Sequence, residues 1–129
     1  MTRHCRYVWE NLITRSPAKS TAIIAHSAGG MCTADLIERY PKDFFKRCEA
    51  LVFTDSGYHS VFTSTKLTKE MVDRLAQIGI HFKAYRHDHM EVGEVFKQQY
   101  GSIPEVSAGT TEHVLTTGVS TPAIKDFLN

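Results

Sequence analysis

Short apolar runs alternate with amphipathic segments along this chain of 129 residues, and this alternation constrains its fold more than any other feature. Two runs, Thr21–Ala25 and Ala50–Thr54, are apolar on both faces, which is typical of central strands in a parallel sheet. Two further runs, Ile80–Tyr85 and Pro104–Ala108, also read as strands. The pattern predicts a single α/β domain over residues 1–129, with a parallel sheet, right-handed crossovers and helices on both faces.

Apolar residues at helical spacing predict the segments between these strands. An opening helix spans about Arg3–Thr14, and a second one follows Gly29-Gly30 and closes at Pro41. A third helix is capped by Thr68 and ended by Gly79. Two more are expected, one carrying Val92, Val95 and Phe96 and a C-terminal one starting at Ser120-Thr121-Pro122.

The charge balance gives the chain no overall attraction to nucleic acid or to an anionic membrane, because 15 Lys and Arg face 14 Asp and Glu. We therefore expect neither direct nucleic-acid binding nor membrane binding. The first six residues lack the apolar core of a signal peptide, and three cysteines without CxxC spacing favour reduced thiols, so we expect an intracellular protein. The basic residues that could form a local patch alternate with acids or stand singly; they are Arg3, Arg6, Lys66, Lys69, Lys83 and Arg86.

The segment Ile23–Gly30 carries the clearest chemical signal, a strand that runs into a serine, small residues and a helix. It is typical of a nucleophile elbow, in which the strained turn around Ser27 requires small residues two positions before and after it, here Ala25 and Gly29. The backbone N–H of Ala28 then points to where an oxyanion would form. The elbow and oxyanion residues expected from this motif are His26, Ala28, Gly29 and Gly30.

The order of residues after the elbow matches a Ser-acid-His triad. His113 follows the last predicted strand and would take the proton of the Ser27 hydroxyl. Two acids compete for the orienting role: Asp55 ends the strand after the elbow, and Asp88 ends the strand after that. Each could instead be structural, Asp55 in a turn and Asp88 in a solvated loop. His26 could donate a hydrogen bond to the site or be a satisfied, partly buried histidine.

Three histidines, His81, His87 and His89, lie close together in sequence, and His87-x-His89 would put two rings on one side of an extended segment. A third ligand at suitable spacing is absent, so we expect no metal and no cofactor.

Four blocks together resemble the Argonaute-binding protein two domain family, which includes the family-with-sequence-similarity one hundred seventy-two group. The blocks are Tyr7-Val8-Trp9, Ile24–Gly30, Phe53–Ser56 with His59 soon after, and Val106–His113 with Phe127 in the closing helix. The resemblance implies an α/β-hydrolase-like fold. It also implies a subunit of an Argonaute-siRNA chaperone complex in heterochromatin silencing, or cotranscriptional and splicing regulation, with an Argonaute-type partner and a nuclear or cytoplasmic location.

Two departures from this family bear on the site and the fold. Relatives carry Pro-Leu-Asp where this chain reads Arg86-His87-Asp88, so the resemblance leaves the acid open. A full hydrolase-like domain takes about 200 residues, and the predicted strands supply only its C-terminal half, which lacks the loop that donates the second oxyanion N–H. We therefore expect a truncated domain that serves as an interaction module with negligible esterase turnover on its own. The alternative is an active serine esterase or thioesterase.

Overall fold

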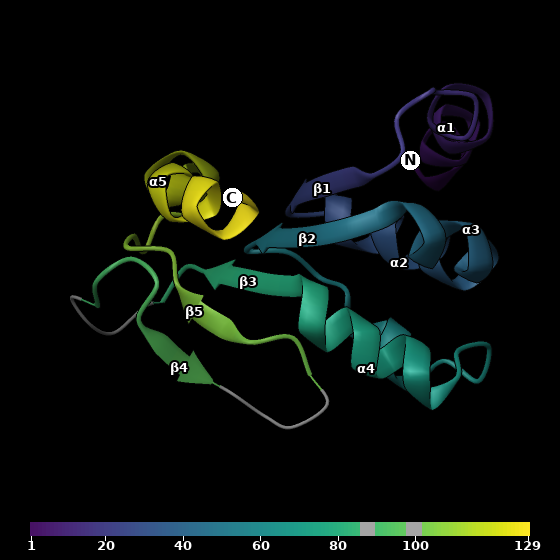
Figure 1. Cartoon of the computed structure of the whole chain (residues 1–129). Coiled ribbons are helices and arrows are strands. Elements are labelled where there is room, and N and C mark those ends of the chain that lie inside the picture. Colours follow the sequence, from purple (N-terminus) through teal and green to yellow (C-terminus); the bar gives the residue numbers. More distant parts are fainter. Residues whose placement is uncertain (86–89, 98–101) are drawn as a thin grey trace.

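The computed structural model describes residues 1–85, 90–97 and 102–129, and its centre is a five-stranded sheet in the order β1-β2-β3-β5-β4 (Figure 1). The strands are β1 (Thr21–His26), β2 (Cys48–Thr54), β3 (Gly79–Lys83), β4 (Val95–Lys97) and β5 (Glu105–Ser107). Strands β1, β2, β3 and β5 are parallel neighbours, and β4 pairs antiparallel with β5. The predicted parallel α/β sheet is confirmed.

Within the described residues, five α-helices connect and cover the strands: α1 (Thr2–Val8), α2 (Gly29–Arg39), α3 (Pro41–Arg47), α4 (Lys69–Ile78) and α5 (Thr116–Leu128). A π-helical turn, Trp9–Ile13, continues α1, so the predicted opening helix exists but changes its winding. Short 3₁₀ helices span His59–Thr63 and His113–Leu115. No helix in the described ranges has the length and apolar character needed to cross a membrane.

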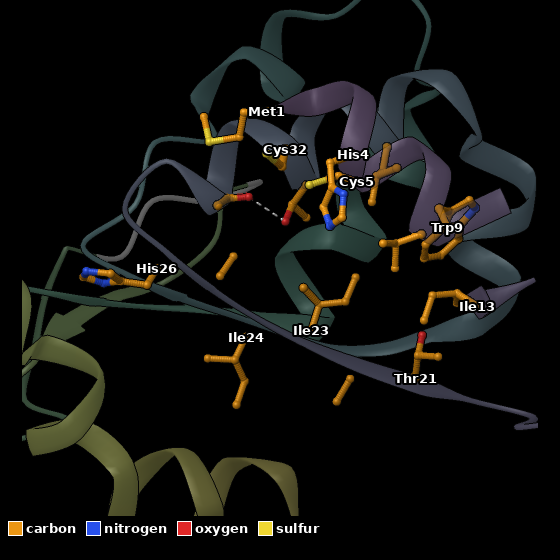
Figure 2. Close-up of a pocket in the computed structure, with 16 residues that line it drawn as sticks. Met1, His4, Cys5, Trp9, Ile13, Thr21, Ile23, Ile24, His26 and Cys32 are labelled. Carbon is orange, nitrogen blue, oxygen red and sulfur yellow. Dashed lines mark hydrogen bonds between the residues drawn. The ribbon is translucent and has the colours of Figure 1, made fainter. Parts of the chain in front are cut away.

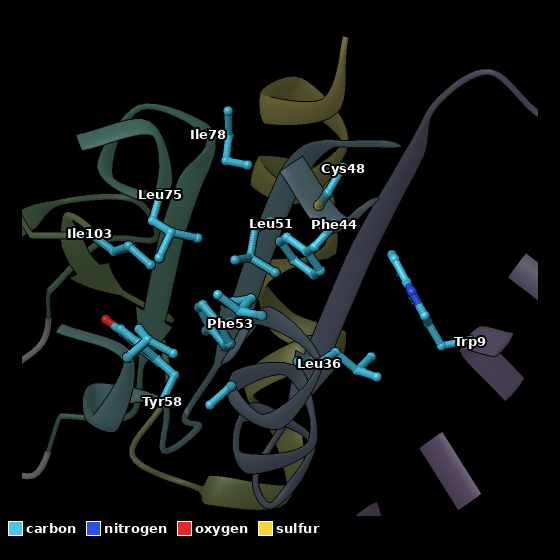
Figure 3. Close-up of a cluster of buried hydrophobic side chains, with 14 residues drawn as sticks. Trp9, Leu36, Phe44, Cys48, Leu51, Phe53, Tyr58, Leu75, Ile78 and Ile103 are labelled. Carbon is cyan, nitrogen blue, oxygen red and sulfur yellow. The ribbon is translucent and has the colours of Figure 1, made fainter. Parts of the chain in front are cut away.

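Strand β2 joins two hydrophobic layers, because its residues alternate between the two faces of the sheet. Leu51 and Phe53 face the larger layer, where Phe44 of α3 and Leu75 of α4 are also fully buried (Figure 3). On the opposite face, Val52 packs with Phe82, Val106 and Ile124 of α5. Helices therefore cover both faces of the sheet, as predicted. Each of these buried side chains contributes about 1.5–3 kcal/mol to the stability of the fold.

Two prolines of the sequence interpretation can be checked in the structure. Helix α2 ends at Arg39, just before Pro41, as predicted. Pro41 also opens α3, a helix that was not predicted, because a proline is favoured in the first turn, where no N–H partner is needed. Pro122 does not start the last helix but lies inside α5, which already begins at Thr116.

The prediction of a helix at Val92, Val95 and Phe96 is also wrong. Val95 begins β4, which pairs with β5. The backbone N–H of Gly93 donates to the carbonyl of Ser107 (2.9 Å), and the Ser107 N–H donates to the carbonyl of Glu94 (2.8 Å). Backbone pairing with the edge of β5 thus outweighs the helical pattern of the segment that contains Val95.

Both predicted ends of α4 are confirmed. The Thr68 hydroxyl accepts a hydrogen bond from the Met71 N–H (3.3 Å). Gly79 is the C-cap residue and begins β3, although its backbone is extended rather than left-handed. A Cβ there would lie 2.7 Å from the Leu75 carbonyl oxygen and 2.8 Å from Ile103, so close packing, rather than a left-handed backbone, accounts for this glycine.

Candidate active site

Ser27 stands in a sharp turn between β1 and α2. Its φ is 52°, in the left-handed region that costs a residue other than glycine about 1–2 kcal/mol. The Ser27 N–H still continues the sheet ladder by donating to the Thr54 carbonyl (3.2 Å), and Ala28 is the N-cap of α2. This strand-turn-helix geometry places the serine at the carboxyl edge of the sheet.

Asp55 repeats the same arrangement one strand away. It follows β2 directly, has a φ of 44°, and donates its N–H to the Phe82 carbonyl (2.8 Å). Because β1 and β2 are adjacent and parallel, the turns that carry Ser27 and Asp55 meet at the same edge of the sheet.

His113 bridges these two residues from the loop after β5. Its Nε2 lies 2.9 Å from Ser27 Oγ and its Nδ1 lies 2.5 Å from Asp55 Oδ2. In the tautomer that this arrangement fits, the Nδ1–H donates to the carboxylate and Nε2 accepts from the serine hydroxyl. The Thr116 hydroxyl donates to the His113 carbonyl (2.9 Å) and so holds the short 3₁₀ turn that presents the ring.

The structure therefore brings together Ser27, His113 and Asp55. The other candidate acid, Asp88, lies outside the described residues, as do His87 and His89. Among the described residues, no group of His, Cys, Asp and Glu side chains is arranged to hold a metal ion.

Ser56, which the sequence analysis did not single out, connects the turn that carries Ser27 (the serine turn) to the turn that carries Asp55 (the acid turn). Its hydroxyl donates to the Ser27 carbonyl (2.5 Å) and accepts from the Gly30 N–H (2.8 Å). Because Ser56 directly follows Asp55 and is buried, these two bonds hold the turn of Asp55 at a fixed distance from Ser27. A small hydroxyl residue next to the acid was the only sequence signal for this role.

The glycines after Ser27 differ in their steric demand. A Cβ on Gly29 would lie 3.5 Å from the Ala25 Cβ, which is an ordinary contact. A Cβ on Gly30 would lie 2.5 Å from the Gly57 carbonyl oxygen and would also overlap Ser56 Oγ. The small residue that the elbow motif expects at Gly29 therefore need not be a glycine, whereas glycine itself is required at Gly30, which packs against the turn that carries Asp55.

His26 lies beside His113. Its ring centroid is 4.7 Å from that of His113, and its Nδ1–H donates to the Thr54 carbonyl (3.0 Å). The ring thus supports one face of His113 while its own hydrogen bond ties β1 to β2.

Behind the acid turn, His81 is almost completely buried and accepts a hydrogen bond from the Ser56 N–H at its Nε2 (3.2 Å). Burial lowers the pKa of His81 to about 4, although the Glu105 carboxylate, 3.5 Å from its Nδ1, acts in the opposite direction. His81 is therefore neutral at pH 7 and serves as a fixed acceptor for the turn. The strand alternation put His81 on one side of β3 but gave no sign of this role.

Comparison with protein-family models shows a match to the Arb2 domain over residues 1–76, more than half of the chain. The chain belongs to the Arb2 domain family. This Arb2 chain is 28% identical over 126 residues to the cotranscriptional regulator ARB2A of Homo sapiens, and 27% identical over 128 residues to the ARB2A homolog of Gallus gallus. These alignments cover 96% and 98% of the Arb2 chain but only 29% of each relative.

A third relative, ARB2BP of Homo sapiens, is 28% identical over 125 residues, which make up 94% of the Arb2 chain and 33% of that protein. The Arb2 chain thus spans about a third of the length of the curated relatives it matches. No solved structure matches it. The family resemblance noted from the sequence is confirmed by these comparisons.

Proposed function

We propose that this chain carries the nucleophile, base and acid of a serine hydrolase on an α/β-hydrolase-like sheet. The observation that supports the proposal most strongly is the chain of contacts from Ser27 Oγ through His113 to Asp55, at 2.9 and 2.5 Å. Nucleophile, base and orienting acid within hydrogen-bond reach of one another are the arrangement that acyl transfer requires. The elbow between β1 and α2 and the position of the site at the carboxyl edge of a parallel sheet also support the hydrolase-like fold.

The proposed reaction is hydrolysis of an ester or thioester. Ser27 Oγ attacks the carbonyl carbon while its proton passes to His113 Nε2, and the Asp55 carboxylate stabilises the resulting imidazolium. The Ala28 N–H, for which no acceptor is found within the described ranges, would stabilise the oxyanion. His113 then protonates the leaving alcohol or thiol. It next takes a proton from the water that attacks the acyl-serine, which releases the acid and restores Ser27.

A fluorophosphonate probe tests this proposal on the full chain, since it reads out the reactivity of the serine without requiring efficient turnover. We expect stoichiometric labelling at Ser27, located by mass spectrometry, with none in Ser27→Ala and a rate at least about 100-fold lower in His113→Ala. His59→Ala, which alters an exposed histidine outside the triad, serves as the matched control and should label like the wild type. A folded protein that does not label, or that labels equally in His113→Ala, would contradict the proposal.

Turnover is a weaker readout than labelling. An oxyanion site that lacks one donor loses about 10²–10³ in rate, so with the Ala28 N–H as its donor we expect hydrolysis of p-nitrophenyl acetate to be slow.

A second candidate function is an interaction role in cotranscriptional regulation or siRNA-mediated heterochromatin silencing in the nucleus. The names of the human and chicken relatives favour cotranscriptional regulation, and the silencing role rests on the family resemblance alone. An Argonaute-type protein is the partner that the family resemblance suggests. Pull-down of a purified Argonaute protein with the wild type and with Ser27→Ala tests this role, and we expect equal capture by both. Loss of capture only in Ser27→Ala would mean that the elbow itself is the binding surface, and no capture by either would refute this partner.

A further inference from the structure

A basic hollow lies at the end of β1 that is farthest from Ser27. It is lined by four residues of the connection that leads into β1 and by the last two residues of α3, namely Ser16, Pro17, Ala18, Lys19, Lys46 and Arg47. Its volume is about 380 Å³, and no carboxylate lines it. The groove that runs along β1 is different, because its lining is mostly apolar and holds no lysine or arginine (Figure 2). The basic hollow therefore suits an anion.

Arg47 links the connection to α3. Its guanidinium donates hydrogen bonds to the Thr14 carbonyl (2.9 Å) and to the Ala18 carbonyl (3.4 Å), so Ser16 lies midway along the segment that the guanidinium bridges. The Arg47 Nε–H is buried and finds no hydrogen-bond acceptor among the described residues, although the Asp43 carboxylate lies 3.5 Å away. An acceptor placed near Ser16 would satisfy this donor.

Two lysines add to the positive charge of the basic hollow. Lys19 and Lys46 are exposed and line it beside Arg47, which gives three cations against the single carboxylate of Asp43. Such a cluster favours a doubly charged anion over a singly charged one, because each cation adds its own attraction. A phosphate group has this charge, and it has enough oxygens to accept from several donors at once.

Ser16 is the residue of the basic hollow that can carry a phosphate. Its hydroxyl accepts a hydrogen bond from the Ala18 N–H (3.2 Å), so the oxygen is held in the wall of the hollow. In Ser16-Pro17-Ala18-Lys19 a proline follows the serine and a lysine lies three positions on, which is the pattern that proline-directed kinases select. Residues 17–20 are exposed, and within the described ranges they make no hydrogen bond from backbone to backbone. A kinase can therefore engage this segment without breaking the sheet.

The other serine or threonine that precedes a proline has the opposite surroundings. Thr121-Pro122 lies inside α5, and the Thr121 hydroxyl donates to the Thr117 carbonyl (2.9 Å). The residue three positions on is Ile124, which is buried and not basic. A kinase that takes an extended substrate would have to unwind α5, so Thr121 is an internal control for access.

We propose that Ser16 is a phosphorylation site for a proline-directed serine kinase and that its phosphate is held in the basic hollow by Lys19, Lys46 and Arg47. The Ser16 hydroxyl oxygen attacks the γ-phosphorus of ATP while the bond to the β-phosphate oxygen breaks. ADP leaves, and the hydroxyl proton passes to the general base of the kinase. The phosphate then supplies the acceptor that Arg47 Nε lacks and ties the connection to the end of α3.

Incubation of the full chain with ATP and a purified cyclin-dependent kinase tests the first part of the proposal. We expect stoichiometric phosphate at Ser16, located by mass spectrometry, none in Ser16→Ala, and a rate at least about tenfold lower in Pro17→Ala, which keeps the hydroxyl but removes the residue that the kinase selects. Thr121 should stay unmodified in the folded chain. An unmodified Ser16, or equal modification of Ser16 and Thr121, would overturn the proposal.

Thermal unfolding of the phosphorylated and unphosphorylated forms tests whether the basic hollow holds the phosphate. Phosphorylation should raise Tm by about 2–4 °C in low salt and by less in 1 M NaCl, where charges are screened beyond about 3 Å. The rise should shrink in Lys46→Gln and persist in Lys42→Gln, a matched control that alters an exposed lysine of α3 outside the lining. Because each variant is compared with its own unphosphorylated form, its intrinsic stability cancels.

Two results would overturn this second part of the proposal. The first is a Tm that phosphorylation leaves unchanged or lowers. The second is an equal rise when millimolar inorganic phosphate is added to Ser16→Ala, which would mean that the basic hollow takes a free anion. Since the basic hollow and Ser27 lie at opposite ends of β1, failure of this proposal and failure of the proposed hydrolase are independent and distinguishable.

Discussion

Replacing Gly30 by alanine perturbs the contact between the elbow and the acid turn with a single methyl group. The new Cβ would lie 2.5 Å from the carbonyl oxygen of Gly57, a backbone atom that cannot rotate away, and would overlap Ser56 Oγ. The hydroxyl of Ser56 would have to move, and its bonds to the Gly30 N–H and to the Ser27 carbonyl would be lost or weakened. The substitution therefore acts on stability and on the geometry of the site together.

The expected cost follows from the size of the overlap. Overpacking in a rigid interior costs about 1–3 kcal/mol, and alanine regains less than about 1 kcal/mol through its higher helix propensity, so we expect a net loss of about 1–2 kcal/mol. For 129 residues the entropy of unfolding is about 0.27 kcal/mol/K, so a net loss of about 1–2 kcal/mol lowers Tm by about 4–7 °C. Thermal unfolding followed by circular dichroism measures this shift.

Gly29→Ala is the matched control, because it adds the same methyl group one residue earlier. Its Cβ meets only the Ala25 Cβ, at 3.5 Å, so we expect a Tm equal to or slightly above that of the wild type. Fluorophosphonate labelling of Ser27 should slow in Gly30→Ala and stay normal in Gly29→Ala. A Tm of Gly30→Ala as high as that of the wild type, or an equal drop in both variants, would refute the steric argument.

Three further predictions concern single side chains. Asp55→Asn should slow fluorophosphonate labelling by about 10²–10⁴ and Asp88→Asn should leave it unchanged; the reverse result would assign the acid to Asp88. The pKa of His81 is lowered to about 4 in the folded protein, so the unfolded chain binds more protons between pH 4 and 6.5 and stability falls as the pH drops through this window. Urea unfolding should show a loss of about 2 kcal/mol from this group between pH 7.5 and 5, and His81→Gln, which keeps an acceptor for Ser56, should lack that part; an unchanged pH dependence would contradict it. Burial raises the pKa of the Cys48 thiol to about 11, so iodoacetamide at pH 8 should modify the more exposed Cys5 first and reach Cys48 only on unfolding, and early modification of Cys48 would count against its burial.

The sequence predicted those elements whose local pattern agrees with their tertiary surroundings. The two-sided apolar runs of β1 and β2 could pack only as covered strands, and the positions of Ser27 and His113 followed from the elbow and from chain order. Between the two acids the sequence could not decide. Adjacency of β1 and β2 brings Asp55 to the same edge as Ser27, and strand adjacency is a property of the assembled sheet.

Other errors had the same origin. The segment at Val95 forms a strand despite its helical spacing, because pairing with β5 outweighs a weak local preference for a helix. Proline restricts φ and removes one donor, which suits both the end of one helix and the start of the next, so the sequence predicted the end of α2 before Pro41 but missed the start of α3 there. Ser56 and His81 escaped notice because their role lies in contacts between strands that are distant in sequence.

The left-handed backbone at both Ser27 and Asp55 has a consequence for how such a chain changes under selection. Each of these residues adopts a conformation that glycine would adopt with less strain, at a cost of about 1–2 kcal/mol per residue, with less for aspartate, which tolerates this region better. Selection for thermal stability alone would therefore favour glycine at these two positions. A lineage that has stopped using the side chains should therefore lose the hydroxyl and the carboxylate first, while its sheet remains intact. A serine and an aspartate that persist there despite this pressure distinguish a working site from the relic of one.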